Sequence, residues 1–441
     1  MMRLKDNKEL SSIFSSSLSL VFIRVGGLVS GFLLMLLLAR TMSAEELGRV
    51  ITGISIVMLL SVFSTLNYDA GGLRYLSAYL AKGKSSLVAS YIKYGDTLTW
   101  IAGGSIVTIA VAYWAIAKYA SVPVLPNYIL YAFISVLIFG RMRLFSGYMH
   151  ASGKVVIAQL PRSFIRQLLF LLATGALVLA GIELNADLVM QMFFLTLCVV
   201  AIFQIYLFRP YLKALTNETV VESDKKRDWR LIGFYTLTPV LFLEFSVDVI
   251  ILISALVLSK ADVAVLAVVL RIAGFLQFGV TAVNMAVGPK IAAAIHNDER
   301  HTVDHLLRIS GALKLVLVVI GMIFFYFFGG HILSVFGDEY SQGSGSLLLF
   351  ACIPLVISLF GPGVLFVTVL DMQKYLNPVF ISSLVVLFIL ITFLGSRLGI
   401  QGIAFAVLIV WTIWNLTLYY LTKQKHGYDI SVANLLTAQK H

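Results

Sequence analysis

Charged residues are scarce in this chain of 441 residues, at 12 % of the composition, while hydrophobic residues make up 59 %. A soluble domain carries about 25 % charged residues and roughly 45–50 % apolar ones. A water-soluble protein of this length cannot bury such an excess of apolar side chains. The composition therefore excludes a soluble protein and predicts an integral membrane protein.

Cysteine and several functional motifs are also nearly or wholly missing. The two cysteines, Cys198 and Cys352, both lie in apolar stretches, which excludes a disulfide framework and a CxxC metal site. The phosphate-binding pattern GxxxxGK[ST] is absent, and the loops are too short to hold an ATP-hydrolysing domain. We therefore expect a protein that is not an enzyme and that has no catalytic residues and no metal.

Apolar runs long enough to cross a bilayer as helices fill most of the chain. A spanning helix needs about 20 mostly apolar residues, whereas a barrel strand needs only about 9–11 with alternating polarity. The runs are apolar on all sides, which predicts an all-α fold. The first run, Ser11–Ala39, is interpreted as a retained span because no A-x-A cleavage site follows it. The twelve predicted spans are 11–39, 46–66, 87–117, 127–149, 155–181, 186–208, 231–258, 262–288, 304–333, 345–370, 376–396 and 399–421.

Positive charge is distributed unevenly between the two sides of these spans. With the N-terminus in the cytoplasm, 26 of the 33 Lys and Arg residues fall on the cytoplasmic side and five on the outer side. This bias predicts a multi-pass protein with both termini in the cytoplasm. The net charge of +11 is thus explained by topology and gives no reason to expect nucleic acid as a partner. Two arginines, Arg24 and Arg271, remain within predicted spans.

The two halves of the chain share a weak internal repeat. A shift of 216 residues places Ser43 on Ser259, Arg74 on Lys290 and Gly95 on Gly311. We predict an N-terminal six-helix lobe over residues 1–209, a cytoplasmic linker over 210–230 and a C-terminal six-helix lobe with a short tail over 231–441. Because six is an even number, the lobes form a parallel pseudo-repeat around a central cavity.

Short segments along the chain resemble a known transporter family. After the first span, Leu37-Leu38-Ala39-Arg40-Thr41-Met42-Ser43-Ala44-Glu45-Glu46-Leu47-Gly48 is similar to a segment of polysaccharide-type flippases. These belong to the multidrug/oligosaccharidyl-lipid/polysaccharide (MOP) exporter superfamily. Further similar segments are Asp69–Leu76, Asp248–Leu252, Ala282–Asn284 followed by Pro289, and Gly399–Ala404. The resemblance covers about residues 13–421.

The resemblance implies a function as well as a fold. Such a protein flips undecaprenyl-diphosphate-linked oligosaccharide, an O-antigen (lipopolysaccharide) or exopolysaccharide repeat unit, across the bacterial inner membrane by alternating access. It needs no cofactor beyond coupling to a proton or sodium gradient. Its partners are membrane lipids, and a glycan polymerase and a chain-length regulator of the same pathway.

Two other functions remain open at this stage. A multidrug or cation antiporter of the same superfamily shares the fold, but it is expected to carry an acid in the first lobe, where span one carries Arg24. A membrane glycan polymerase or ligase is an enzyme for which we expect a large outer loop, and the outer loops of this chain are short.

Charged residues at membrane depth are the first candidates for the transport site, because burying them in hydrocarbon is costly. Arg24 and Arg271 are predicted to bind the diphosphate or an acidic sugar, since guanidinium matches phosphate oxygens in a bidentate manner. Glu244 and Asp248, one turn apart on one face of the predicted seventh span, are predicted to be counter-charges or cation-coupling sites. The alternative is a buried ion pair that only fixes helix register.

A second group of candidates lies toward the cytoplasmic ends of the helices. Asp69 and Arg74 are predicted to receive the polar headgroup, although a helix-terminal salt bridge explains them equally well. Four further arginines near spans four and five are interpreted mainly as contacts to anionic lipid headgroups, with a pyrophosphate entry site as the alternative. They are Arg141, Arg143, Arg162 and Arg166.

Overall fold

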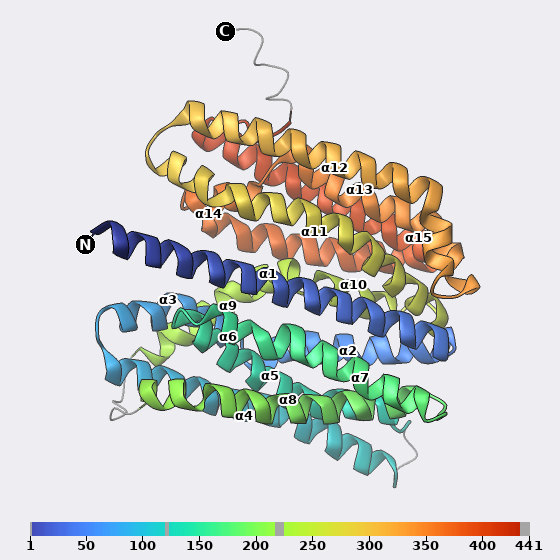
Figure 1. The fold of residues 1–441 in the computed structure, drawn as a ribbon. Helices are drawn as coiled ribbons and strands as arrows, with labels where there is room; N and C mark the ends of the chain where they lie inside the picture. Colours follow the sequence, from blue (N-terminus) through green and yellow to red (C-terminus); the bar gives the residue numbers. More distant parts are fainter. Residues whose placement is uncertain (1, 120–122, 217–224, 433–441) are drawn as a thin grey trace. The chain divides into compact units, whose positions relative to one another are not determined.

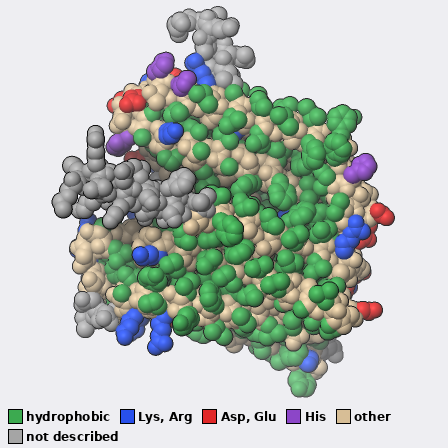
Figure 2. Space-filling view, viewed as in Figure 1, with side chains coloured by type: hydrophobic (Ala, Val, Ile, Leu, Met, Phe, Trp, Pro, Cys, Tyr) green, Lys and Arg blue, Asp and Glu red, His purple; other side chains and the backbone are tan. Residues whose placement is uncertain are grey.

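A computed structural model describes residues 2–119, 123–216 and 225–432, and every regular element within these ranges is a helix. Hydrophobic side chains cover the sides of the helices, whereas the charged residues and histidines gather mainly at their ends (Figure 2). This pattern is the one expected where helix sides meet lipid and helix ends meet water. The all-α membrane fold predicted from the sequence is confirmed.

The chain divides into two compact units, Met1–Asp248 and Val249–His441. The helix that begins the predicted seventh span therefore packs with the N-terminal unit. The predicted linker 210–230 is helical at both ends, up to Thr216 and from Lys226 onward. Residues 217–224 lie outside the described ranges.

The N-terminal unit is built around α5, which packs against α2, α4 and α8 (Figure 1). Helix α1 packs against α7 and the π-helix η1. The elements are α1 (Met2–Thr41), α2 (Ala44–Ser64), α3 (Tyr68–Ala81), α4 (Ser85–Ala117), α5 (Asn127–Ala151), α6 (Val155–Gln159), η1 (Leu160–Ile165), α7 (Arg166–Leu179), α8 (Ala186–Thr216) and α9 (Lys226–Leu243). Helix α10 (Ser246–Ser254) begins in this unit.

The C-terminal unit packs four long helices side by side, α11 against α12 and α13, and α13 against α15 (Figure 1). Its elements are α11 (Lys260–His296), α12 (Arg300–Ser334), η2 (Asp338–Gly343), α13 (Ser344–Phe360), α14 (Gly363–Val369), η3 (Gln373–Tyr375) and α15 (Leu376–His426).

The number of spans in the described ranges agrees with the twelve predicted when the bent pair α9 and α10 is counted as one span and α15 is divided at its break. Ten described helices are long and apolar enough to cross a membrane, and the bent pair α9 and α10 gives an eleventh. Helix α15 has 51 residues, about 76 Å of helix, which is more than twice the thickness of the hydrocarbon core. It loses helical geometry at Gly399 (φ 59°, ψ −138°), where the predicted twelfth span begins.

The internal repeat has a structural counterpart at the start of a helix in each unit. Ser43 accepts a hydrogen bond from the Glu46 amide at 3.3 Å and caps α2. Ser259, its equivalent at a shift of 216, accepts one from the Asp262 amide at 3.1 Å and caps α11. Both serines have extended backbone angles, and an acid follows each cap in the first turn, where the helix dipole favours negative charge.

The predicted seventh span is not one continuous helix. Helix α9 ends where the amides of Glu244 and Phe245 both donate to the Val240 carbonyl, and α10 continues at an angle of 72°. The prediction that Glu244 and Asp248 share one helix face is therefore wrong. Glu244 caps the C-terminus of α9, whereas Asp248 lies in the first turn of α10.

The last described residues, Gly427–Val432, form a strap that closes one end of the C-terminal unit. Tyr428 and Ile430 are buried beside Ile291, Val303 and Phe366. The Val432 amide donates to the Leu359 carbonyl at 2.9 Å, at the end of α13 where the helix breaks before Pro362. The strap thus binds a backbone carbonyl that the helix break leaves unpaired.

Asp429 holds the strap to α15. Its carboxylate accepts hydrogen bonds from Lys423 Nζ at 2.9 Å and from Ser431 Oγ at 2.6 Å. Partial burial works against the charged form, but the hydrogen bonds from Ser431 and Lys423 prevail and lower the pKa of Asp429. Because the folded pKa is depressed, this stabilisation is fully present above about pH 4 and is lost as the pH falls through the folded pKa.

We expect Gly361→Ala to destabilise the C-terminal unit. Gly361 has φ +81°, and a Cβ there would lie 1.9 Å from the Ile430 carbonyl oxygen. The left-handed backbone alone costs roughly 1–3 kcal/mol for a residue with a side chain, and the clash displaces the strap. Thermal unfolding in detergent measures the effect. Gly330→Ala in α12 is the matched control, because its Cβ would meet nothing within 4 Å; an equal melting temperature for both variants would contradict the prediction.

Candidate functional site

Three arginines of the N-terminal unit gather around the π-helix η1, and we call Arg24, Arg162 and Arg166 the arginine cluster. Arg24 Nε on α1 donates to Gln159 Oε1 at 3.4 Å, one residue before η1. Arg162 lies in η1 itself, and Arg166 Nε donates back to the Arg162 carbonyl at 3.1 Å. Arg162 and Arg24 both interact electrostatically with His150 at the end of α5.

Close packing between α1 and η1 brings Arg24 to this position. A Cβ on Gly27 would lie 2.3 Å from the Ser163 carbonyl oxygen, and one on Gly26 would lie 2.7 Å from the Phe164 ring. Only glycine permits this approach. The extra residue of a π-turn, here containing Pro161, also re-aims the side chains that follow, and π-turns are frequent at functional sites. The adjacent glycines are thus packing residues that position a candidate binding residue.

Two acidic residues lie beside the arginine cluster. Glu244 Oε1 is 3.5 Å from Arg162 Nη2, and both side chains are partly exposed (46 % and 29 %). Asp248 accepts a hydrogen bond from the Ser55 hydroxyl on α2 and interacts electrostatically with Arg166. The predicted counter-charges therefore meet Arg162 and Arg166 within this unit, two arginines that the sequence analysis assigned mainly to lipid headgroups.

Asp69 belongs to a different and more deeply buried network. Its Oδ2 accepts a hydrogen bond from Arg143 Nε at 2.7 Å, and the Arg143 side chain is only 1 % exposed. Arg143 Nη2 also donates to Asn67 Oδ1 at 3.0 Å, and its guanidinium lies 4.9 Å from the centre of the Phe245 ring. The interpretation of Arg143 as a headgroup contact at a helix end is wrong, because α3, α5 and the end of α9 enclose it.

This network fixes a strained turn between α2 and α3. Leu66 and Asn67 both have positive φ values, 47° and 52°, which is costly for residues with side chains. Asn67 Nδ2 donates to Thr236 Oγ1 on α9 at 2.9 Å, while its oxygen accepts from Arg143. Helix α9 approaches closely here, since a Cβ on Gly233 would lie 2.5 Å from the Leu66 carbonyl oxygen.

The remaining predicted residues lie apart from these two networks. Arg74 is exposed on α3. Arg271 is half-buried in α11 of the C-terminal unit, about 16 Å of helix from Lys260. It makes no hydrogen bond or ion pair with another residue of the described ranges.

A charged residue at membrane depth was missed in the C-terminal unit. Lys314, one of the 26 basic residues predicted to lie on the cytoplasmic side, lies in α12, is 1 % exposed and donates to Asn284 Oδ1 on α11 at 3.1 Å. Lys314 lies about 21 Å of helix beyond Arg300, inside the predicted span 304–333. The position of Lys314, ten residues inside the predicted span 304–333, is the sequence signal that marks it as a charge within a membrane helix.

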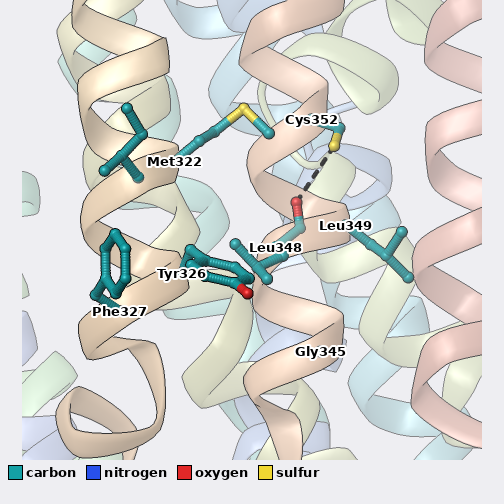
Figure 3. Close-up of a pocket in the computed structure, with 8 residues that line it drawn as sticks. Met322, Tyr326, Phe327, Gly345, Leu348, Leu349 and Cys352 are labelled. Carbon is teal, nitrogen blue, oxygen red and sulfur yellow. Dashed lines mark hydrogen bonds between the residues drawn. The ribbon is translucent and has the colours of Figure 1, made fainter.

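An apolar groove of about 520 Å³ lies between α12 and α13 (Figure 3). Met322 and Tyr326 on α12 point toward Leu348 and Cys352 on α13, and the Cys352 thiol donates to the Leu348 carbonyl at 3.4 Å. Every residue that lines this groove is uncharged. The groove therefore offers nothing that would select a charged cargo, and we place the candidate site at the arginine cluster.

The MatE family profile matches residues 239–387, and the fold matches solved MATE transporters over almost the whole chain. An inward-facing multidrug resistance MATE family transporter of the MOP superfamily aligns with a TM-score of 0.74 at 12 % identity, covering 93 % of this chain and 96 % of the other. The chain has the fold of a MATE transporter.

Two further solved structures support this fold. The MATE multidrug transporter DinF-BH, solved with a bound ligand, aligns with a TM-score of 0.64 at 13 % identity, covering 93 % and 96 % of the two chains. An outward-facing multidrug resistance MATE family transporter aligns with a TM-score of 0.61 at 13 % identity, covering 95 % and 96 %. No curated protein matches in sequence.

These comparisons agree with the fold that the resemblance implies. They do not support the polysaccharide subtype that the sequence segments resemble, because the matched family and structures are of the MATE type.

We expect Arg143→Ala to destabilise the N-terminal unit strongly while Arg74→Ala leaves it unchanged. Removing Arg143 leaves the Asp69 carboxylate buried without its partner and releases Asn67, which costs about 3–5 kcal/mol. Arg74 is exposed on the same segment, so its removal changes stability by about 0.5 kcal/mol or less. Thermal unfolding of both purified variants tests this, and equal melting temperatures would show that the network does not hold the fold.

Proposed function

We propose that this chain is a membrane exporter whose N-terminal unit binds an anionic group of its cargo at the arginine cluster. The carrying observation is that Arg24 contacts the residue before η1, while Arg162 lies in η1 and Arg166 directly follows it, all within membrane-spanning helices. Three guanidinium groups against Glu244 and Asp248 leave a net positive charge. Arginine stays charged at any working pH and binds phosphate oxygens in pairs.

The anionic cargo that fits best is the diphosphate of an undecaprenyl-linked oligosaccharide. Both the arginine cluster and the sequence segments that resemble polysaccharide-type flippases support this cargo. The headgroup binds the arginines while the polyprenyl chain stays in the bilayer, because moving that much hydrocarbon through water is strongly unfavourable. Arg271 in the C-terminal unit stays a candidate for the same role.

Multidrug export is the second candidate, because the family profile and the solved relatives favour it. A cationic drug would need the acids of the site rather than its arginines, and Glu244 and Asp248 are the acids available. The two candidates differ in the sign of the charge on the cargo. Proteoliposomes loaded separately with a fluorescent polyprenyl-diphosphate glycan and with a cationic rhodamine dye distinguish them.

We expect Arg24→Ala and Arg162→Ala each to lower glycan flipping about tenfold or more, with normal abundance in the membrane. A charge-assisted hydrogen bond to phosphate contributes about 1.5–3 kcal/mol, which corresponds to that loss. Lysine at either position is expected to restore part of the activity, since it keeps the charge without the paired geometry. The measurement is the amount of lipid-linked repeat units that accumulate at the inner leaflet.

Arg397→Ala is the matched control, because Arg397 is exposed and lies against the Phe393 ring in the C-terminal unit. Wild-type flipping by both cluster variants would rule out the binding role of the arginine cluster. Transport of the rhodamine dye that survives these substitutions but fails in Glu244→Gln would favour the multidrug candidate.

Asp248 is proposed to couple transport to a proton or sodium gradient, because its carboxylate accepts a hydrogen bond from the neutral Ser55 hydroxyl while Arg166 acts on it electrostatically. We expect Asp248→Asn to bind cargo normally but to lose the response of transport to an imposed gradient. Glu244→Gln is expected to keep that response, since its partly exposed pair with Arg162 is weak. Flux in proteoliposomes with and without each gradient is the measurement, and a gradient response in Asp248→Asn would exclude the coupling role.

A further inference from the structure

A second positively charged site lies in the N-terminal unit, away from the arginine cluster. It is a groove of about 320 Å³ between α9 and the helices α2 and α4. Arg227 and Arg230 lie at one end, and the rest of the wall is aromatic or aliphatic. The lining residues are Phe63, Leu66, Tyr68, Leu98, Arg227, Arg230, Leu231, Phe234 and Leu237.

The outward face of α9 supplies both parts of this groove. Arg227, Arg230, Leu231, Phe234 and Leu237 recur at helical spacing and so lie along one side of the helix. The opposite side is fixed to the protein: Trp229 is buried and its Nε1 donates to Tyr79 Oη at 3.0 Å, and Thr236 accepts from Asn67. The groove face is therefore held in place and is not free to rotate inward.

Neither arginine of the groove has a protein partner within the described residues, and both are exposed. The lysines next to them are occupied, because Lys225 and Lys226 each lie 5.8 Å from the centre of a tyrosine ring, Tyr79 and Tyr94. The acid of this turn, Asp228, acts on Tyr75. Two positive charges without a partner among the described residues thus lie at one end of an apolar groove.

The apolar part of the groove is exposed and has the length of one bilayer leaflet. Phe234 is 72 % exposed, Leu66 44 % and Leu231 39 %. From Arg227 to Leu237 the helix rises about 15 Å, which is half of the roughly 30 Å hydrocarbon core. A lipid with its phosphate at the arginines would lay one acyl chain along the whole groove.

We propose that this groove binds an anionic phospholipid of the surrounding membrane, with its phosphate at Arg227 and Arg230 and an acyl chain against Phe234, Leu237 and Leu98. A free phosphate ion would use the arginines but not the apolar wall. Basic pockets between membrane helices on the side of the positive charge bind acidic lipid headgroups by this combination. The site is independent of the proposed cargo, because it shares no residue with the arginine cluster.

Native mass spectrometry of the full-length protein with phosphatidylglycerol, in a background of phosphatidylcholine, tests the site. We expect Arg227→Gln/Arg230→Gln to weaken phosphatidylglycerol binding about tenfold or more, since each arginine near an anionic lipid surface contributes about 1 kcal/mol. Leu237→Trp, which fills the groove and keeps both charges, is expected to weaken binding as well. Lys82→Gln/Lys84→Gln is the control, because it removes two exposed charges that do not line the groove.

Four results would overturn the proposal. They are wild-type binding by the double arginine variant, equal retention of phosphatidylcholine, displacement of the lipid by millimolar inorganic phosphate, and a clear preference for undecaprenyl phosphate over phosphatidylglycerol. Unchanged melting temperatures in all variants establish that any loss of lipid is not a loss of fold. Glycan flipping and dye transport are measured on the same preparations, so failure of this site leaves the proposed function to its own test.

Discussion

The buried ion pair between Arg143 and Asp69 is the interaction on which the N-terminal unit depends. A charge enclosed among membrane helices is stable only when its hydrogen-bonding groups find partners in the protein. Arg143 from α5 meets Asp69 at the start of α3, and through Asn67 it also reaches Thr236 on α9. One polar network thus joins three helices, holds the strained backbone at Leu66 and Asn67, and fixes the face that α9 turns away from the unit. The lipid groove that we propose lies on that other face of α9.

Interrupted helices carry most of the chemistry of this protein. The π-helix η1 contains Arg162, and Arg24 contacts Gln159 directly before it. The bend after α9 separates Glu244 from Asp248. The C-terminal strap packs against the break at Gly361. A regular helix satisfies its own backbone and offers lipid only side chains, whereas an interruption frees backbone groups that neighbours must bond. The same interruptions let side chains leave the regular helical register, which places charged groups inside the protein.

The charge of the site and the comparisons with known proteins bear on different parts of the function. The fold and the MatE segment identify a transporter architecture, and fold alone does not select the cargo. The cargo is selected by side chains, and those at η1 are mainly arginines. This is why a protein with the fold of multidrug transporters is proposed to carry an anion, and why the sign of the charge on the cargo is the property to measure first.

The sequence by itself determined the membrane class, the helical spans and the repeat of Ser43 at Ser259, because apolar length and helix capping are local properties of the chain. It also singled out Arg24 as a charge that topology does not explain. Only the tertiary structure decided which charges meet. It placed Arg24 against the segment that carries Arg162 and Arg166, enclosed Arg143 with Asp69, buried Lys314 against Asn284, and parted Glu244 from Asp248. Pairing of this kind depends on helix packing and on breaks within helices. Both arise from contacts between residues far apart in the chain, which spacing along the sequence does not record.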